Sequence, residues 1–389
     1  MVAKSQVPPY RRAVDADVVV IGAGVVGAAI ALAVARRGVA VTLVEAEPAP
    51  ALAASGTNSG IVHTGFDSTP GELETQLILR SGRLRDPVLE ALGVPVVRCG
   101  ALLRPRGDAD RATVDALAAN ARRNGVAVKR RSDGALVVTR EAITDPVAYT
   151  LGLVAAAERH GAELRTSWRA ASMRARSGGI ELDETGGERL RCRVAVNCAG
   201  LRADEVARLG GDDSFTIYPR KGEFLVFDPP GGEPLGHILL PVPTKRTKGV
   251  LVFPTLDGKV VAGPTAVDGE DKDDWSVRDE AVSEILGPAI AAYPQLEGAD
   301  PVAAYAGLRP AGRGVNYAIG PSRACPGLVN VAAVRSTGLT ASLAIAEHVA
   351  NLVERAGVHL GPEQELLPGA VPAPDGPWWR RTARHREAA

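Results

Sequence analysis

A chain of 389 residues is long enough for two or three domains of about 150 residues each and for a core that encloses a cofactor. Hydrophobic residues make up 46% of the chain and charged residues 23%, a composition that excludes a disordered or coiled-coil protein. Because Lys plus Arg (45) equals Asp plus Glu (45), the chain lacks the broad positive field that binding to nucleic acid or to an anionic membrane requires.

The cysteines and the N-terminus restrict the chemistry and the location. Cys99, Cys192, Cys198 and Cys325 show no paired C-x-x-C spacing, so neither a zinc site nor a disulfide framework is indicated. The N-terminal residues are polar and interrupted by proline, without the apolar core of a secretory signal. No apolar run approaches the ~18 residues that span a bilayer. We expect a cytoplasmic protein without a transmembrane segment, a bound metal or a nucleic-acid partner.

The first predicted elements form a βαβ unit. Residues 18–21 (VVVI) are a short β-branched run that leads directly into the glycine-rich turn 22–27 (GAGVVG). An apolar helix follows over 28–37, Gly38 is placed to cap it, and residues 39–44 form a second buried strand. Strand, tight turn, helix and strand in this order are typical of a nucleotide-binding fold.

The next elements alternate between loop, helix and strand. Residues 55–71 are rich in Gly, Ser, Thr and Asn, which indicates a loop over a site. A region of mixed strands and helix follows between 96 and 145. The other predicted elements are helices over 75–92, 145–161, 201–209 and 339–354, strands over 190–196 and 328–333, and a turn at 197–200.

Two further regions depart from this alternation. Between 215 and 309, short β runs separated by Pro and Gly predict a mixed or antiparallel sheet. The proline-rich, basic tail after 367 is expected to be a poorly ordered end with a docked tryptophan pair. The fold class is therefore α/β (α+β), with a Rossmann-like βαβ domain interleaved with a mixed or antiparallel β-sheet domain.

The glycine turn predicts a dinucleotide site. In the spacing G-x-G-x-x-G, Gly22 makes the tight turn, Gly24 lets a pyrophosphate approach the backbone, and Gly27 lets the helix pack on the strand. The phosphate charge then lies at the helix N-terminus, where the dipole and unpaired N–H groups favour an anion. Glu45, at the end of the second strand, can accept hydrogen bonds from ribose hydroxyls and disfavours the extra phosphate of NADP. The motif alone does not distinguish FAD from NAD.

Three later segments bear on that choice. The loop 55–71, the turn 197–200 and the turn 335–340 come from far-apart parts of the chain and are predicted to converge on one sheet edge. A nicotinamide enzyme normally completes its second mononucleotide half directly after the first. Several converging turns instead indicate a large, enclosed cofactor.

Six segments carry a resemblance to a known family: NSGIVHTG (58–65), RKGE (220–223), VPT with KG (242–244 and 248–249), VAGPTA (261–266), AGLRP (306–310) and STGLT (336–340). In this order they resemble the FAD-dependent oxidoreductases of the D-amino-acid-oxidase structural group. Within that group they are most similar to the glycerol-3-phosphate oxidases and dehydrogenases and to the L-2-hydroxyglutarate dehydrogenases. The glycerol-phosphate enzymes often have proline where Thr337 stands, whereas Gly338, at which the backbone would approach the flavin, is present.

The resemblance implies FAD as the cofactor and a discontinuous domain arrangement. Residues 15–92, 145–212 and 314–360 would form the FAD-binding domain, residues 93–144 and 213–313 the substrate domain, and residues 361–389 a C-terminal tail. The implied FAD-binding residues are Gly22, Gly24, Gly27, Glu45, Thr57, Asn58, Ser59, Gly60, Ala199, Gly200, Gly307, Ser336, Gly338, Leu339 and Thr340.

The implied chemistry is the oxidation of a secondary alcohol next to an anionic group. A base takes the hydroxyl proton while a hydride leaves for flavin N5. His63 is the candidate base, because a neutral imidazole with the usual pKa of about 6.5 is available at physiological pH. Two alternatives for His63 are a hydrogen bond within its loop and a covalent histidyl–flavin link.

The implied substrate contacts are basic side chains. Arg309 resembles the family arginine that binds the substrate's anionic group, for which a planar fork of donors is suited. A structural salt bridge is its alternative. Lys248 matches a lysine of the glycerol-phosphate oxidases that would stabilise a developing alkoxide or the phosphate. A solvated turn charge is the alternative for Lys248 and for Lys245, and Lys221 carries a weaker signal.

These expectations rank the functions. The first is oxidation of sn-glycerol-3-phosphate to dihydroxyacetone phosphate, and the second is oxidation of L-2-hydroxyglutarate or another L-2-hydroxy acid. The third is oxidation of an amine or amino acid, in which His63 would be incidental. A non-enzymatic flavin-binding or tRNA-modifying protein is disfavoured by the neutral charge. The sequence leaves open whether oxygen, a quinone or another carrier accepts the electrons.

Overall fold

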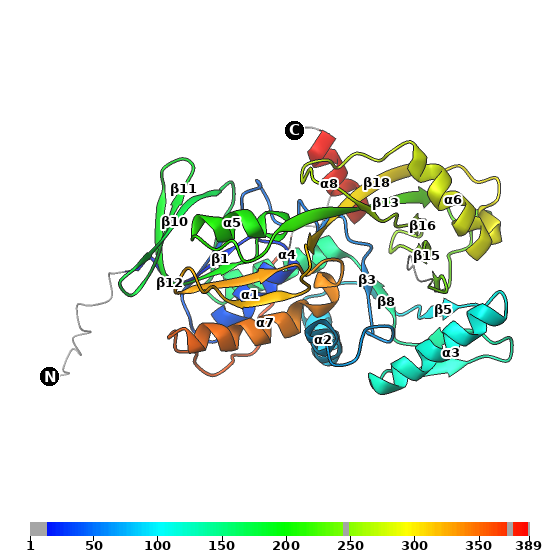
Figure 1. The fold of residues 1–389 in the computed structure, drawn as a ribbon, viewed down its shortest axis with the longest axis horizontal. Helices are drawn as coiled ribbons and strands as arrows, with labels where there is room; N and C mark the ends of the chain where they lie inside the picture. Colours follow the sequence, from blue (N-terminus) through cyan, green and yellow to red (C-terminus); the bar gives the residue numbers. More distant parts are fainter. Residues whose placement is uncertain (1–13, 244–248, 372–375, 388–389) are drawn as a thin grey trace.

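The computed structural model describes residues 14–243, 249–371 and 376–387. Its first sheet has a parallel core in the order β20–β12–β1–β2–β9, and β11 pairs antiparallel with β12 (Figure 1). The β-branched residues of β1 are buried, as expected of a central parallel strand covered on both faces. The strands of this sheet are β1 (Ala16–Ile21), β2 (Val41–Val44), β9 (Glu163–Arg165), β10 (Ala170–Arg176), β11 (Gly179–Glu184), β12 (Arg189–Asn197), β19 (Ala318–Pro321) and β20 (Leu328–Ala332).

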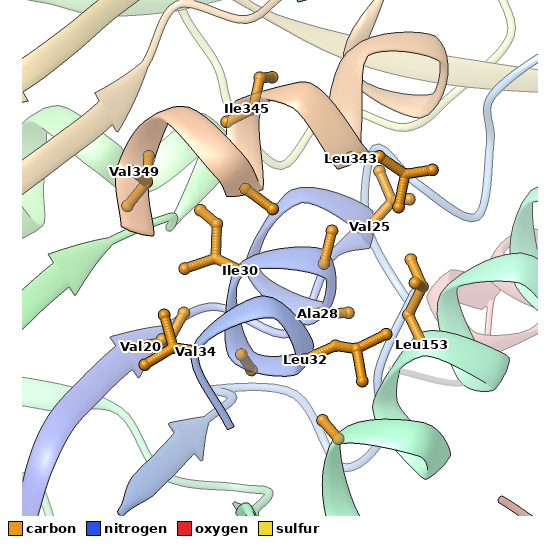
Figure 2. Packing of buried hydrophobic residues seen from close by; sticks show 14 of the residues in the cluster. Val20, Val25, Ala28, Ile30, Leu32, Val34, Leu153, Leu343, Ile345 and Val349 are labelled. Carbon is orange, nitrogen blue, oxygen red and sulfur yellow. The ribbon is translucent and has the colours of Figure 1, made fainter. Parts of the chain in front are cut away.

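Helix α1 (Val25–Ala35) is the most enclosed helix at this sheet. It is apolar around its circumference, because it lies between the sheet, α4 (Pro146–Arg159) and α7 (Gly338–Arg355). Figure 2 shows Ile30 on the side of α1 that faces α7 and Leu32 on the side that faces α4. Helix α2 (Leu73–Ala91) packs against α7, and α5 (Ala203–Leu209) follows β12 through a short 3-10 turn.

The second sheet is mixed and mostly antiparallel. Its longest ladder joins β13 and β18, from the pair Ile217 and Gly312 to the pair Val226 and Ala303. Helix α6 (Glu280–Ala292) packs against β13, β15 and β16, and α3 (Asp108–Arg123) contacts β6. The strands are β5 (Ala101–Leu103), β6 (Val128–Arg130), β7 (Leu136–Val138), β13 (Ile217–Phe227), β14 (Ile238–Leu240), β15 (Leu251–Pro254), β16 (Val260–Gly263), β17 (Val267–Asp268) and β18 (Ala303–Gly312).

A small third sheet positions the loop that carries His63. Its strands are β3 (Ile61–Val62), β4 (Val96–Val97) and β8 (Ala142–Thr144), with β8 in the middle. The predicted loop 55–71 therefore contains a short strand that its polar composition did not indicate. This strand forms because Ile61 and Val62 are both buried and pair with β8.

The predicted fold class is confirmed, and most predicted elements lie within a few residues of those observed. Asp145 begins α4 as expected, since its carboxylate accepts hydrogen bonds from the Val147 and Ala148 amides at 2.8 and 2.9 Å. The strands β9 to β11 and helix α6 were not predicted.

The prediction of a poorly ordered tail was wrong for the last described residues. Helix α8 (Trp378–Glu387) packs against β18 and α4 (Figure 1). The docked tryptophan pair is confirmed, because Trp378 and Trp379 are both 2% exposed and Trp378 meets the ring of Tyr305 edge-on at 5.8 Å. These two large apolar side chains anchor a helix whose remaining residues are mostly polar.

Candidate active site and cofactor cleft

The glycine turn between β1 and α1 has no room for side chains on its inner side. Gly22 has a φ of +107°, and a Cβ there would lie 2.5 Å from the carbonyl oxygen of Cys198. A Cβ on Gly27 would collide with the carbonyl oxygen of Gly22. The first turn of α1 contains no acidic side chain, so no carboxylate there neutralises the positive end of the helix dipole. The turn therefore fits the diphosphate of a dinucleotide.

A cleft of about 380 Å³ lies against this turn, a volume within the range of ligand sites. It forms where the carboxyl ends of parallel strands meet at one sheet edge. Among the predicted cofactor residues, those that line it are Gly22, Gly24, Gly27, Glu45, Asn58, Ala199, Gly200, Gly338 and Leu339. Those that lie outside its lining are Thr57, Ser59, Gly60, Gly307, Ser336 and Thr340.

Glu45 follows β2 and folds back onto the glycine turn. One carboxylate oxygen accepts a hydrogen bond from the Ala23 amide at 2.7 Å, and the other accepts one from the Glu47 amide at 2.9 Å. Burial raises the pKa of Glu45, and the two backbone hydrogen bonds oppose this effect. Each carboxylate oxygen can accept a further hydrogen bond, so Glu45 can still bind ribose hydroxyls.

Residues outside the lining connect the cleft to His63. The Asn58 side chain, which lines the cleft, donates a hydrogen bond to the carbonyl oxygen of Ser336 at 3.3 Å. The His63 amide donates to the Thr340 hydroxyl at 3.0 Å. Thr340 lies in the first turn of α7, whose residues Gly338 and Leu339 line the cleft. His63 thus lies next to the end of the cleft that these segments form.

A buried carboxylate orients the imidazole of His63. His63 follows β3 and Glu141 precedes β8, and the pairing of Val62 with Ala142 places them side by side. The Nδ1 of His63 lies 3.0 Å from Oε2 of Glu141, whose other oxygen accepts from the Thr64 amide at 2.7 Å. The Glu141 side chain is 0% exposed and that of His63 is 31% exposed. A carboxylate that accepts from Nδ1–H holds the neutral ring in the tautomer with its basic lone pair on Nε2.

Arg309 lies on β18 near the same loop. It shares one face of the strand with Gly307, since alternate residues point the same way, and a Cβ on Gly307 would lie 3.0 Å from the carbonyl oxygen of Thr57. The Nη2 of Arg309 donates hydrogen bonds to the carbonyl oxygens of Thr265 at 2.7 Å and Lys221 at 3.3 Å. These contacts fix the guanidinium without neutralising it.

Arg309 forms no ion pair within the described part of the chain, although the carboxylate of Asp268 is near enough to act on its charge. No carboxylate of residues 14–243, 249–371 or 376–387 forms an ion pair with it, so the alternative of a structural salt bridge is not observed there. Burial lowers the pKa of Arg309 to about 10, and repulsion from Arg220 adds to this, so the group is still a cation at neutral pH. A Cβ on Gly222 would collide with its Nη2, which explains the glycine at that position.

The lysine predictions have different outcomes. Lys248 and Lys245 lie outside the described residues. Lys221 is buried on β13, and its Nζ donates to a carboxylate oxygen of Asp274 at 2.6 Å and to the carbonyl oxygen of Ser276 at 3.0 Å. Lys221 therefore holds the segment before α6.

Comparison with known proteins decides the family. The sequence signature of the DAO family of FAD-dependent oxidoreductases matches residues 17–352. The chain belongs to this family. The predicted enzyme class and the predicted cofactor, FAD, are thereby confirmed. The glycine turn, Glu45 and the other lining residues of the cleft have the backbone approach and the hydrogen-bonding groups that would hold FAD.

Three relatives are 25–27% identical to this DAO-family chain over the aligned residues. It is 27% identical over 368 residues to the glycerol 3-phosphate dehydrogenase of Caloramator mitchellensis, covering 90% of this chain and 76% of that protein. It is 25% identical over 288 residues to the L-2-hydroxyglutarate dehydrogenase of Escherichia coli K12, covering 69% and 68%. A solved structure of dithionite-reduced L-α-glycerophosphate oxidase from Mycoplasma pneumoniae with FAD bound matches with a TM-score of 0.83 and 25% identity, covering 90% and 97%.

Sequence reasoning missed Glu141 and the side chains that reach the cleft from α8 and from the segment before α6. Glu141 is 78 residues from His63, and no local pattern separates it from the exposed Arg140 beside it. Trp275 and Arg386 line the cleft from regions expected to be a β-rich domain and a disordered end. Among the described residues, no group of His, Cys, Asp and Glu is arranged to hold a metal, and no helix is long and apolar enough to cross a membrane.

Proposed function

We propose that this FAD-dependent oxidoreductase oxidises sn-glycerol-3-phosphate to dihydroxyacetone phosphate, a secondary alcohol next to an anionic group. The observation that carries the proposal is the buried Glu141 that engages Nδ1 of His63. An alcohol must lose its hydroxyl proton and so needs a base, whereas an uncharged amine is dehydrogenated without a strong one. Relatives named as a glycerol 3-phosphate dehydrogenase and a glycerophosphate oxidase support the substrate class.

Each side chain would have one role. His63 would accept the hydroxyl proton at Nε2, and Glu141 would stabilise the imidazolium that forms. Arg309 would bind the phosphate, because its Nε and Nη1 have no hydrogen-bond acceptor among the described residues. Bound FAD supplies the acceptor for the hydride that leaves the carbon, so the alcohol becomes a ketone.

A second candidate substrate is L-2-hydroxyglutarate or another L-2-hydroxy acid. A guanidinium binds carboxylate and phosphate with the same planar donors, so Arg309 does not separate the two anions. The relative named as an L-2-hydroxyglutarate dehydrogenase supports this candidate. In both reactions His63 and Glu141 would have the same roles.

Anaerobic mixing of the FAD-loaded protein with a panel of substrates tests the proposal. Glycerol-3-phosphate should bleach the long-wavelength flavin absorption band faster than L-2-hydroxyglutarate, and L-amino acids should leave it unchanged. Bleaching by amino acids alone would overturn alcohol oxidation, and bleaching by L-2-hydroxyglutarate alone would replace the first substrate by the second. Reoxidation of the reduced protein by oxygen and by a quinone then identifies the electron acceptor.

Glu141→Gln is expected to slow flavin reduction by about 10²–10³-fold. The glutamine NH₂ group facing Nδ1 would make that nitrogen an acceptor and move the ring proton to Nε2, where it blocks proton uptake. Arg85, which is 5% exposed and donates to the His63 carbonyl oxygen at 3.3 Å, would also lose a nearby negative charge.

Stopped-flow reduction rates measured across pH check this prediction. A positioning role changes the pH profile of the rate, whereas a purely structural role leaves the profile in place and lowers the amount of folded protein. Glu90→Gln, at an exposed position of α2, is the matched control and should behave like the wild type. A Glu141→Gln enzyme with the wild-type rate and profile would contradict the role of Glu141.

A further inference from the structure

The C-terminal helix α8 forms part of the wall of the FAD cleft. Arg386 lines the cleft although it comes from the opposite end of the chain from the glycine turn. The described residues 361–371 lead toward it along α1 and α4, with the Gly361 amide bonded to the Arg37 carbonyl oxygen and the Leu367 amide bonded to Nε2 of His160. Residues 361–371 therefore lie beside the C-terminal ends of α1 and α4, and α8 lies at the cleft.

Helix α8 holds a cleft segment that lacks regular structure of its own. Residues 47–56 run between Glu45 and the loop 57–60, and five consecutive residues of this stretch, 51–55, line the cleft. Arg381 donates hydrogen bonds to the carbonyl oxygens of Pro50 at 2.9 Å and Ala51 at 3.2 Å. Arg386 donates to the Leu52 carbonyl oxygen at 3.1 Å. The shape of this wall therefore depends on α8.

Arg386 and His385 join α8 to Glu47, two residues after the ribose-side carboxylate of Glu45. Nη2 of Arg386 lies 2.9 Å from one oxygen of Glu47, and Nε2 of His385 lies 2.9 Å from the other. Burial opposes ionisation of Glu47, but the contacts with His385 and Arg386 outweigh it, so the pKa of Glu47 is lowered. Glu47 lines the cleft together with Glu45. Helix α8 thus closes the end of the cleft at which Glu45 lies. This is the end where we expect the nucleotide half of FAD, because Glu45 is the predicted ribose contact.

The second side of this closure comes from the segment before α6. The guanidinium of Arg386 stacks over the ring of Trp275 at 5.0 Å, and both residues line the cleft. The segment around Trp275 is tied to the second sheet and to α5, because Lys221 on β13 pairs with Asp274 and Lys272 pairs with Asp204 on α5. The Arg386–Trp275 stack therefore joins two walls of the cleft.

Within the described residues, this stack leaves two buried N–H groups without a hydrogen bond, as do Trp378 and Trp379 at their Nε1 atoms elsewhere on α8. Nε of Arg386 and Nε1 of Trp275 are buried and have no hydrogen-bond acceptor in the part of the chain that the structure describes. Buried N–H groups nearly always have a partner, and leaving them without one weakens the contact that buries them. The contact between α8 and Trp275 is therefore weaker than one in which both N–H groups are hydrogen-bonded.

We propose that α8 and Trp275 form a clasp over the nucleotide half of the FAD site, and that this clasp opens to admit and release FAD. The stack and the contacts with Glu47 join residues of the protein to one another. They must therefore break before FAD enters the cleft and again before FAD leaves it. Weakening the stack therefore raises the rates of FAD association and of FAD release by similar factors. The inference rests on FAD binding, which the family establishes, and is independent of the proposed substrate.

FAD exchange in full-length variants tests the clasp. The association rate is measured from the quenching of flavin fluorescence when FAD is mixed with the apoprotein. The release rate is measured from the recovery of that fluorescence when the holoprotein is strongly diluted. Trp275→Ala and Arg386→Gln should each raise both rates about tenfold, the scale of one lost cation–π contact, and change the dissociation constant by less than about threefold. The double variant should resemble Arg386→Gln, because the Trp275 ring has no stack left to lose once Arg386 is replaced.

Arg380→Gln is the matched control, since Arg380 lies on the same helix, is exposed and stacks on Trp379. It should leave both rates at the wild-type values. The melting temperatures of the apoproteins show whether each variant is folded, and Trp275→Phe, which keeps a ring under Arg386, should restore most of the wild-type rates. Wild-type rates in Trp275→Ala and Arg386→Gln overturn the clasp, as does a rise in the release rate alone. A failure of glycerol-3-phosphate to reduce the flavin overturns the proposed function and leaves the clasp intact.

Discussion

Replacing His63 by glutamine is expected to slow the reduction of bound FAD by substrate by about 10²–10⁴-fold, the usual contribution of a general base. The glutamine amide can still form a hydrogen bond with Glu141, but it has no group that takes up a proton at neutral pH. FAD should remain bound, because His63 does not line the cleft and its backbone amide keeps the hydrogen bond to Thr340. The variant should therefore lose most of its rate of flavin reduction while it keeps its bound FAD.

Anaerobic stopped-flow absorbance measures the reduction rate, and the flavin-to-protein ratio of the purified variant measures cofactor retention. His359→Gln, at an exposed position after α7, is the matched control. A wild-type reduction rate in His63→Gln would remove this residue from the mechanism. The same variant tests the covalent alternative, since a histidyl–flavin link predicts flavin that stays attached to the denatured wild type and is lost from the variant.

Replacing Arg309 by lysine is expected to raise the KM for the anionic substrate by about 10- to 100-fold and to change kcat much less. Lysine keeps the positive charge and can still reach the carbonyl oxygens of Thr265 and Lys221, but it loses the planar fork. Charge-assisted hydrogen bonds contribute about 1.5–3 kcal/mol each, and about 1.4 kcal/mol corresponds to a tenfold change in affinity. The loss of one such bond to the phosphate accounts for the expected range.

Steady-state kinetics with a natural electron acceptor or a dye measures kcat and KM separately. Arg355→Lys, at the exposed C-terminal end of α7, is the matched control and should keep the wild-type KM. A KM for Arg309→Lys that equals the wild-type value would refute the role of Arg309 in anion binding. A lower kcat with an unchanged KM would instead assign Arg309 to the chemical step.

The nucleotide-binding part of the fold could be predicted because its signals are local. The turn from Gly22 to Gly27 needs glycine at positions where a side chain would meet backbone, and the flanking apolar runs identify β1 and α1 within the same short stretch. Asp145 could likewise be assigned as the start of α4 from the residues next to it. The turn at 335–340 was placed at the cofactor site, and Gly338 and Leu339 do line the cleft.

The tail shows where local reasoning failed. The prolines and the basic residues of the tail after 367 favoured a poorly ordered end. In the folded protein Glu47 supplies the partner for Arg386, from 339 residues away, and Tyr305 supplies a ring surface for Trp378. The helix is therefore stabilised by contacts that no pattern near the C-terminus records.

From its residues alone, this chain could be assigned a dinucleotide site and the order of most strands and helices, because spacing and side-chain type can be read directly along the chain. The resemblance to a known family implied FAD and the roles of His63 and Arg309. The carboxylate that orients His63 and the clasp formed by Trp275 and Arg386 could not be found in this way. Whether an acidic or basic side chain is buried, and against which partner, depends on strand register and on packing between distant segments, and both exist only once the chain has folded.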